Sequence, residues 1–122
     1  MGQFTRILVL DDNKPRQMAF QQALIGMIVE QAYTVAEAIQ QLTDHPFDVV
    51  FLDHDLGGKI MVPSGPGTGY EVAQWLRDHP DRMPKQIIVH SINREGSKNI
   101  KSILPQAELC PGAWAMKIGA NK

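Results

Sequence analysis

The stretch Phe47-Asp-Val-Val-Phe-Leu52 decides the fold of this 122-residue chain. It is a short, almost uninterrupted apolar run, and a strand with apolar side chains on both faces must be covered on both faces. Similar runs occur at residues 6–10 and 86–90, and amphipathic stretches lie between them. This alternation predicts an α/β fold in which a parallel sheet is buried under helices, with residues 47–52 as its central strand.

Turn and capping residues indicate where the other elements begin. Pro15 suits the first turn of a helix, and we expect this helix to direct Met18 and Leu24 toward the core. The spacing Thr-x-x-Glu at Thr34 and Thr68 is typical of a capping box and predicts two further helix starts. The expected helices cover approximately residues 15–24, 34–43, 68–76 and 97–104. The expected strands cover residues 6–10, 27–29 (at an edge), 47–52, 86–90 and 113–118.

The composition is that of an ordinary globular domain. With 43% hydrophobic and 20% charged residues, the chain can form one core and does not resemble a disordered segment. We therefore expect a single domain over residues 1–122. The net charge of −1 gives no bulk basicity that would favour nonspecific binding to nucleic acid or to a membrane surface. A single cysteine, short apolar runs and no secretory signal predict a cytoplasmic protein without a membrane span.

Residues 57–69 contain five glycines and two prolines, a composition that excludes a regular element. We expect a loop insertion here, and two interpretations remain open: a plain flexible loop, or a lid next to the functional residues. The glycine amides and Lys59 could approach an anion, although no spacing in the loop is specific for one.

Polar side chains follow several of the expected strands at the point where each strand ends. In an open α/β sheet the ligand site lies outside the carboxyl ends of the strands, so these side chains are expected along one rim. The candidates are Asp11, Asp12, Asp53, His54, Asp55, His90, Ser91, Asn93 and Lys117.

Several carboxylates at one rim would repel each other unless a cation neutralises them. Hard oxygen ligands favour Mg²⁺ or Mn²⁺, and such a divalent metal is the cofactor we expect. The expected ligands are Asp11, Asp12, Asp53 and Asp55. A simpler alternative is that the first two aspartates cap a helix and that the last two shape a turn.

Three of the other candidates, His54, His90 and Lys117, also have two interpretations each. An imidazole can donate or accept a proton at neutral pH, which makes His54 and His90 candidate catalytic groups. The alternatives are packing for His90 and solvent exposure for His54. Ser91 and Asn93 would present a hydroxyl and an amide beside His90. Lys117 is either a phosphate ligand or a charge of the tail.

Several motifs give the chain a resemblance to the receiver domains of two-component response regulators. They are Leu-Val-Leu-Asp11-Asp12, Val-Val-Phe-Leu-Asp53-His-Asp-Leu56 and Thr68-Gly-Tyr-Glu71. The third strand's motif, together with Val89-His-Ser-Ile-Asn93 and Gly96, is most similar to the branch known as cyclic-phosphate processing receiver domains. The resemblance implies a flavodoxin-like three-layer sandwich with a five-stranded parallel sheet, whose fifth helix is truncated or absent here.

The resemblance also implies roles for individual residues. Asp11 and Asp12 would hold Mg²⁺, and Asp53 would stand where a receiver accepts a phosphoryl group. Ser91 and Lys117 would contact the phosphate. A receiver's fifth helix covers one face of the sheet beside the first helix. Without it an apolar face would be exposed, which predicts a partner or a homodimer.

Two functions from different classes are expected, and the first is favoured. It is metal-dependent processing, by hydrolysis or binding, of cyclic nucleotides or cyclic-phosphate ends of RNA. The catalytic candidates are Asp53, His54 and His90, and the phosphate-binding candidates are Ser91, Asn93 and Lys117. The alternative is a stand-alone receiver phosphorylated on Asp53, for which both histidines and Asp55 are unnecessary. A haloacid-dehalogenase-like phosphatase is disfavoured, because its Asp-x-Asp motif belongs after the first strand of a longer domain.

Overall fold

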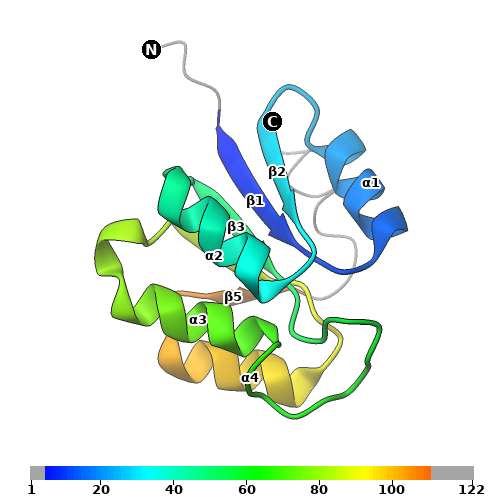
Figure 1. Cartoon of the computed structure of the whole chain (residues 1–122), viewed down its shortest axis with the longest axis vertical. Helices are drawn as coiled ribbons and strands as arrows, with labels where there is room; N and C mark the ends of the chain where they lie inside the picture. The colour runs from blue at the N-terminus through cyan, green and yellow to red at the C-terminus, as the bar shows by residue number, and fades with distance from the viewer. Residues whose placement is uncertain (1–4, 111–122) are drawn as a thin grey trace.

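The computed structural model describes residues 5–110, which form a five-stranded parallel sheet with helices packed on it (Figure 1). The elements in chain order are β1 (Arg6–Leu10), α1 (Lys14–Ala23), β2 (Ile28–Ala32), α2 (Val35–Asp44), β3 (Val49–Leu52), α3 (Gly69–Asp78), the 3-10 helix η1 (Pro80–Arg82), β4 (Gln86–Val89), α4 (Arg94–Ile103) and β5 (Glu108–Leu109). The flavodoxin-like architecture is as predicted, and the described residues contain four α-helices.

The strand order β2-β1-β3-β4-β5 places the three most apolar strands side by side in the middle of the sheet. The register pairs Val9 with Phe51 and Phe51 with Ile88, so the carboxyl ends of β1, β3 and β4 lie at the same level. All four residues of β3 are buried, as expected for a central strand. Because the chain crosses from one side of β1 to the other, the crevice for a ligand opens at the ends of β1 and β3.

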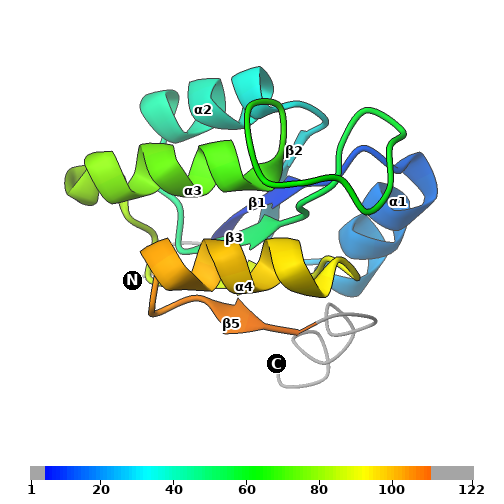
Figure 2. The same ribbon diagram turned by 90° about the horizontal axis from the view of Figure 1, so that it is seen from below.

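Alternate residues of the strands build two separate cores. Leu8, Leu10 and their neighbours on β3 and β4 pack against α2, α3 and α4, and Figure 2 shows α2 and α3 running side by side over this face. Ile7, Val9 and Phe51 pack instead with Phe20 of α1. The expected self-association through the face beside α1 stays a prediction. None of the described helices is long and apolar enough to cross a bilayer.

Both predicted capping residues begin a helix. Thr34 accepts a hydrogen bond from the Glu37 N–H at 3.2 Å, and Thr68 accepts one from the Tyr70 N–H at 3.3 Å. A capping oxygen satisfies an N–H group that has no partner within the helix, which is why this spacing locates a helix start reliably.

Two expectations about the elements were wrong, and a third concerns residues outside the described part of the chain. Met18 does not face the core, since its side chain is 61% exposed; α1 begins at Lys14, and this phase turns Gln17 and Phe20 inward instead. The fifth strand is Glu108–Leu109, earlier than expected, and residues 113–118 lie outside the described residues. The fourth helix begins at Arg94, three residues before the expected start, because Asn93 caps it.

Candidate metal and phosphate site

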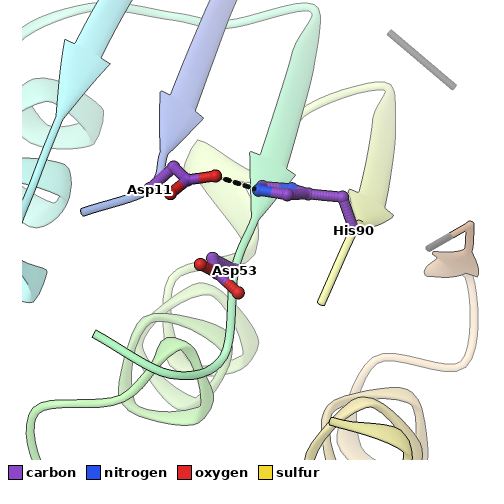
Figure 3. Close-up of side chains that lie close together, drawn as sticks. All are labelled: Asp11, Asp53 and His90. Atoms are coloured by element: carbon purple, nitrogen blue, oxygen red, sulfur yellow. Dashed lines mark hydrogen bonds and ion pairs between the residues drawn. The ribbon is translucent and has the colours of Figure 1, made fainter. Parts of the chain in front are cut away.

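Asp11, Asp53 and His90 follow directly on β1, β3 and β4, and the structure brings all three together. One ligand atom from each lies within 4.8 Å of the other two, and all three residues are buried. Figure 3 shows the side chains converging from the ends of three neighbouring strands, with a hydrogen bond between Asp11 and His90. The rim expected from the strand ends therefore exists, and a compact cluster of three groups lies within it.

Asp11 is the best-satisfied carboxylate of this cluster. Its Oδ2 lies 2.9 Å from His90 Nε2 and accepts a 2.7 Å hydrogen bond from Arg16 Nε, while Oδ1 accepts from Arg16 Nη2 and the Asn13 N–H. Burial raises the pKa of Asp11, but the hydrogen bonds from His90, Arg16 and Asn13 outweigh burial and lower it to about 2. Asp11 is therefore a permanent carboxylate at physiological pH.

Asp53 has the opposite character, because it is buried with few partners. Its Oδ1 accepts the His54 N–H at 2.8 Å, and its Oδ2 is 3.4 Å from Arg16 Nη2. Burial raises the pKa of Asp53 to about 6, with the Asp11 carboxylate adding to the rise and His90 and Arg16 opposing it. Asp53 is thus the group in the cluster whose charge is least compensated.

His90 is packed and hydrogen-bonded at the same time. Its ring makes an edge contact with Phe20, with centroids 5.1 Å apart, which agrees with the packing interpretation. Its Nε2 is fixed by Asp11, whereas its Nδ1 is buried and has no hydrogen-bond partner among the described residues. A buried polar atom without a partner is costly in a purely structural residue, so packing alone does not account for His90.

The donor set fits a hard divalent cation. Two carboxylates and an imidazole within 4.8 Å are ligands that Mg²⁺ or Mn²⁺ accepts, and the uncompensated charge of Asp53 favours a further cation. Arg16 supplies the positive charge in the described structure, and its side chain is 52% exposed, so it can turn away into solvent. Arg16 is not among the site residues predicted from the sequence. The available signal was a basic residue four positions after Asp12, in the first turn of a helix.

Asp12 and Asp55 do not join the cluster, although both were expected to be metal ligands. Asp12 Oδ2 accepts the Gly58 N–H at 2.6 Å. Asp55 uses Oδ1 for His54 and Asn93 and uses Oδ2 for the Met61 N–H. Burial raises the pKa of Asp55, but these hydrogen bonds outweigh burial and lower it. Both carboxylates are therefore engaged with the loop after β3.

His54 and Asn93 lie close to the cluster, but their hydrogen bonds hold the loop after β3, as those of Asp12 and Asp55 do. His54 is fully buried, so solvent exposure was the wrong alternative; its Nδ1 lies 2.7 Å from Asp55 Oδ1, and its Nε2 lies 2.9 Å from Ser64 Oγ. The Asn93 amide N–H₂ donates to Asp55 and to the Val62 carbonyl, and its oxygen accepts the Gly96 N–H. Neither side chain is directed at Asp11, Asp53 or His90 by any of these bonds.

Gly96 makes room for the His54 ring. A Cβ at position 96 would lie 2.5 to 2.6 Å from three ring atoms, and both Gly96 and His54 are buried, so neither can move away freely. We expect Gly96→Ala to lower the free energy of unfolding by about 1 to 3 kcal/mol through overpacking. Urea unfolding measures this, with Lys98→Ala at an exposed position of α4 as the control. Equal unfolding midpoints for the two variants would show that His54 is not held against α4.

A cavity of about 520 Å³ opens over the cluster. Asp53, His90 and Ser91 line it, together with Lys59 and Ile60 of the loop after β3. The Ser91 hydroxyl accepts the Asn93 N–H at 3.1 Å. Ser91 is thus near the cluster, as expected of a phosphate contact, whereas Lys117 lies outside the described residues.

Comparisons with known proteins agree with this fold. The described structure is similar to a CheY-like response regulator receiver domain from Methanospirillum hungatei JF-1, with TM-score 0.72, 19% identity and coverage of 97% of this chain and 90% of that chain. It is also similar to the response regulator TrrA from Thermotoga maritima in complex with Mg²⁺-BeF, with TM-score 0.69, 23% identity and coverage of 90% and 88%.

A third similar structure is a response regulator from Burkholderia pseudomallei with a phosphorylated aspartic acid, a calcium ion and citrate. Its TM-score is 0.69 at 19% identity, covering 96% of this chain and 72% of that chain. The fold is thus that of receiver domains. The model of the family "Cyclic-phosphate processing Receiver domain" matches residues 6–106, and the chain belongs to this family. No curated protein matches the sequence significantly.

Proposed function

We propose that the protein is a metal-dependent phosphodiesterase that opens the cyclic phosphate of a nucleotide or of an RNA end. The observation that carries the proposal is the buried His90 imidazole, bonded to Asp11 and within reach of Asp53. A domain that only accepts a phosphoryl group on an aspartate has no use for an imidazole in this place. The family description, cyclic-phosphate processing, supports the same substrate class.

Asp11 and Asp53 are the residues that would hold a Mg²⁺ or Mn²⁺ ion. Such an ion, when bound, neutralises charge on the phosphoryl oxygens and lowers the pKa of a coordinated water. When the metal ion binds, Arg16 would give up its ion pair with Asp53. Whether Arg16 also leaves Asp11 would depend on the net charge of the metal and its ligand. Asp11 would also keep the His90 ring oriented through Nε2.

His90 is the proposed general acid. The Asp11 carboxylate holds Nε2 and orients the ring, which leaves Nδ1 as the ring atom that would give a proton to the departing ribose oxygen. In the balanced reaction a water oxygen bonds to phosphorus, one phosphorus–ribose oxygen bond breaks, and the freed ribose oxygen takes up a proton. The product is a nucleoside monophosphate, and no covalent intermediate is required.

The cavity also suits the rest of a nucleotide. Ile60 and Ile92 line it and are 77% and 73% exposed, which provides apolar surface for a base or ribose. Ser91 is placed to donate its hydroxyl proton to a non-bridging phosphate oxygen, because its oxygen already accepts from Asn93.

Incubation with 2′,3′- and 3′,5′-cyclic nucleotides plus Mn²⁺ or Mg²⁺ is expected to yield monophosphates. His90→Gln should lower the turnover number by about 10² to 10⁴, since general acid catalysis contributes that much. His79→Gln is the matched control, because His79 stacks on Trp75 at the end of α3. Chromatography of the products measures both. Equal turnover in the two histidine variants would contradict the role of His90, and no product from any cyclic phosphate would contradict the enzyme.

The second candidate function is a stand-alone receiver switch phosphorylated on Asp53. The observation in its favour is that Asp53 directly follows β3 and lines the cavity, beside Asp11. Two similar structures are of response regulators that hold a phosphorylated aspartate or Mg²⁺-BeF. Acetyl phosphate should then add one phosphoryl group to Asp53, detected by mass spectrometry, without turnover of any cyclic nucleotide. A chain that stays unmodified would remove this candidate.

A further inference from the structure

Residues 58–60 line the cavity, and the side chains of Asp12, Asp55 and Asn93 hold the segment 57–64 in place. Asp12 accepts the Gly58 N–H and Asp55 accepts the Met61 N–H, both at 2.6 Å. Asn93 donates to the Val62 carbonyl at 3.0 Å. Gly57 and Gly58 have φ values of 73° and 76°, which other residues rarely adopt, so this backbone path depends on glycine. The loop is therefore built to one shape.

We call His54, Asp55, Asn93 and Ser64 the clamp. A continuous set of hydrogen bonds joins Ser64 Oγ to His54 Nε2, His54 Nδ1 to Asp55 Oδ1, and Asn93 Nδ2 to the same Asp55 oxygen. Every side-chain polar atom of His54, Asp55 and Asn93 has a partner. A fully satisfied buried network specifies a single conformation, because each broken bond would leave a buried polar group without a hydrogen-bond partner.

The hydrogen bonds of the clamp connect a serine, a histidine and an aspartate in the same order as in a catalytic triad. The position of these residues, however, is not that of a catalytic triad. His54 is fully buried, and neither His54 nor Ser64 lines the cavities beside the loop. Ser64 Oγ also accepts a 2.9 Å hydrogen bond from Asn99. A nucleophile needs space for a substrate next to its hydroxyl, and the partly buried Ser64 lines neither cavity, while its Oγ is engaged by His54 and Asn99.

Lys59 lies in the segment that these hydrogen bonds hold beside the cavity. It lines this cavity together with Asp53, His90 and Ser91, it also borders a neighbouring cavity beside α2, and it is exposed. No hydrogen bond or ion pair engages its ammonium group within residues 5–110, whereas the other cation of the cavity, Arg16, is paired with Asp11. A phosphate entering beside Asp53 would meet the carboxylates that line the cavity, so an unpaired cation at the same cavity is the group that favours its entry.

We propose that Lys59 binds the phosphate oxyanion in this cavity and that the clamp holds segment 57–64 so that Lys59 reaches it. His54, Asp55 and Asn93 are then positioning residues, not a catalytic acid, a metal ligand and a phosphate ligand. This inference rests on the proposed phosphate ligand but not on turnover.

The clamp is tested first without any ligand. Trypsin cleaves after Lys59, and cleavage requires the segment to leave its place. Asp55→Asn and Ser64→Ala should each raise the cleavage rate at Lys59 about tenfold or more, since cleavage follows the population of the open segment. Asp44→Asn and Ser102→Ala, at exposed positions of α2 and α4, are the matched controls. Wild-type rates in both clamp variants would overturn the positioning role.

Lys59 is tested with inorganic phosphate as the probe, by calorimetry in the presence of Mn²⁺. Lys59→Ala should weaken phosphate binding about tenfold, which is about 1.4 kcal/mol, and leave the affinity for Mn²⁺ alone unchanged. Lys59→Arg should restore most of the binding, because it restores the charge. Asp55→Asn should also weaken phosphate binding while leaving Mn²⁺ binding intact.

The double variant decides whether the clamp acts through Lys59. Asp55→Asn combined with Lys59→Ala should bind phosphate no more weakly than Lys59→Ala alone, which general loss of structure would not produce. Additive losses, or a Lys59→Ala protein that binds phosphate like the wild type, would overturn the inference even where cyclic nucleotides are hydrolysed. If the variants change phosphate binding as expected but no cyclic nucleotide is hydrolysed, only the proposed function would be overturned. A wild-type protein that binds no phosphate overturns the inference.

Discussion

Asp53→Asn should raise the free energy of unfolding at about pH 7 by about 1 to 3 kcal/mol. The carboxyl group has a pKa of about 6 in the folded protein against an ordinary value of 3.8, so folding favours its protonated form. The stability that it contributes is present below about pH 4 and is lost as the pH rises through about 6. Asparagine keeps the shape without the charge, and it therefore avoids this loss.

The same substitution should abolish function. It removes one of the two carboxylates proposed to hold the metal, and it removes the phosphoacceptor of the alternative function. Urea unfolding at about pH 4 and pH 7 measures the stability, with the exposed Asp44→Asn as the control. We expect the gain over wild type only at the higher pH. A gain of equal size at both pH values would mean that the charge of Asp53 is not its cause.

Asp11→Asn is expected to have the opposite effect on stability. The pKa of Asp11 is about 2, below its ordinary value, so its contribution is present above about pH 4 and is lost as the pH falls through about 2. Removing the charge at about pH 7 should lower the free energy of unfolding by about 2 to 3 kcal/mol. It also leaves Arg16 without its main partner.

Metal binding should fall sharply in the same variant. Asp11 is the only permanent carboxylate of the described cluster, so we expect the affinity for Mn²⁺ to drop at least about 100-fold, which is about 2.7 kcal/mol. Electron paramagnetic resonance of free Mn²⁺ measures this directly. Asp12→Asn is the neighbouring control, because Asp12 lies outside the cluster and bonds to the loop. Similar Mn²⁺ affinities in the two variants would contradict the assignment of the site.

The positions of Asp11, Asp53 and His90 could be predicted from the sequence because they depend only on topology. Each follows an apolar strand, and neighbouring parallel strands must end at one rim. The two-residue strand β5 could not be predicted in the same way, because Glu108 and Leu109 form no apolar run. Its place is set by pairing with β4.

Which of the neighbouring polar residues joins the cluster, and which holds the loop, could not be predicted either. Asp53 and Asp55 are two positions apart at the end of one strand, yet one lies in the cluster and the other holds the loop. Sequence spacing does not fix the path of the backbone after a strand ends, and side-chain direction follows from that path. Arg16 was missed for a similar reason: its return to Asp11 depends on α1 beginning at Lys14.

In the strand order β2-β1-β3-β4-β5, the strands that carry the proposed reactive groups lie inside the sheet, and the two edge strands carry none of them. The proposed chemistry draws one side chain from each of the three inner strands, and none of the three comes from β2 or β5. An engineer could therefore remodel both borders of the sheet, to add a tether or a new recognition surface, without touching the reactive groups. Changes to β1, β3 or β4 offer no such freedom, since a shift in any of them would displace a reactive group.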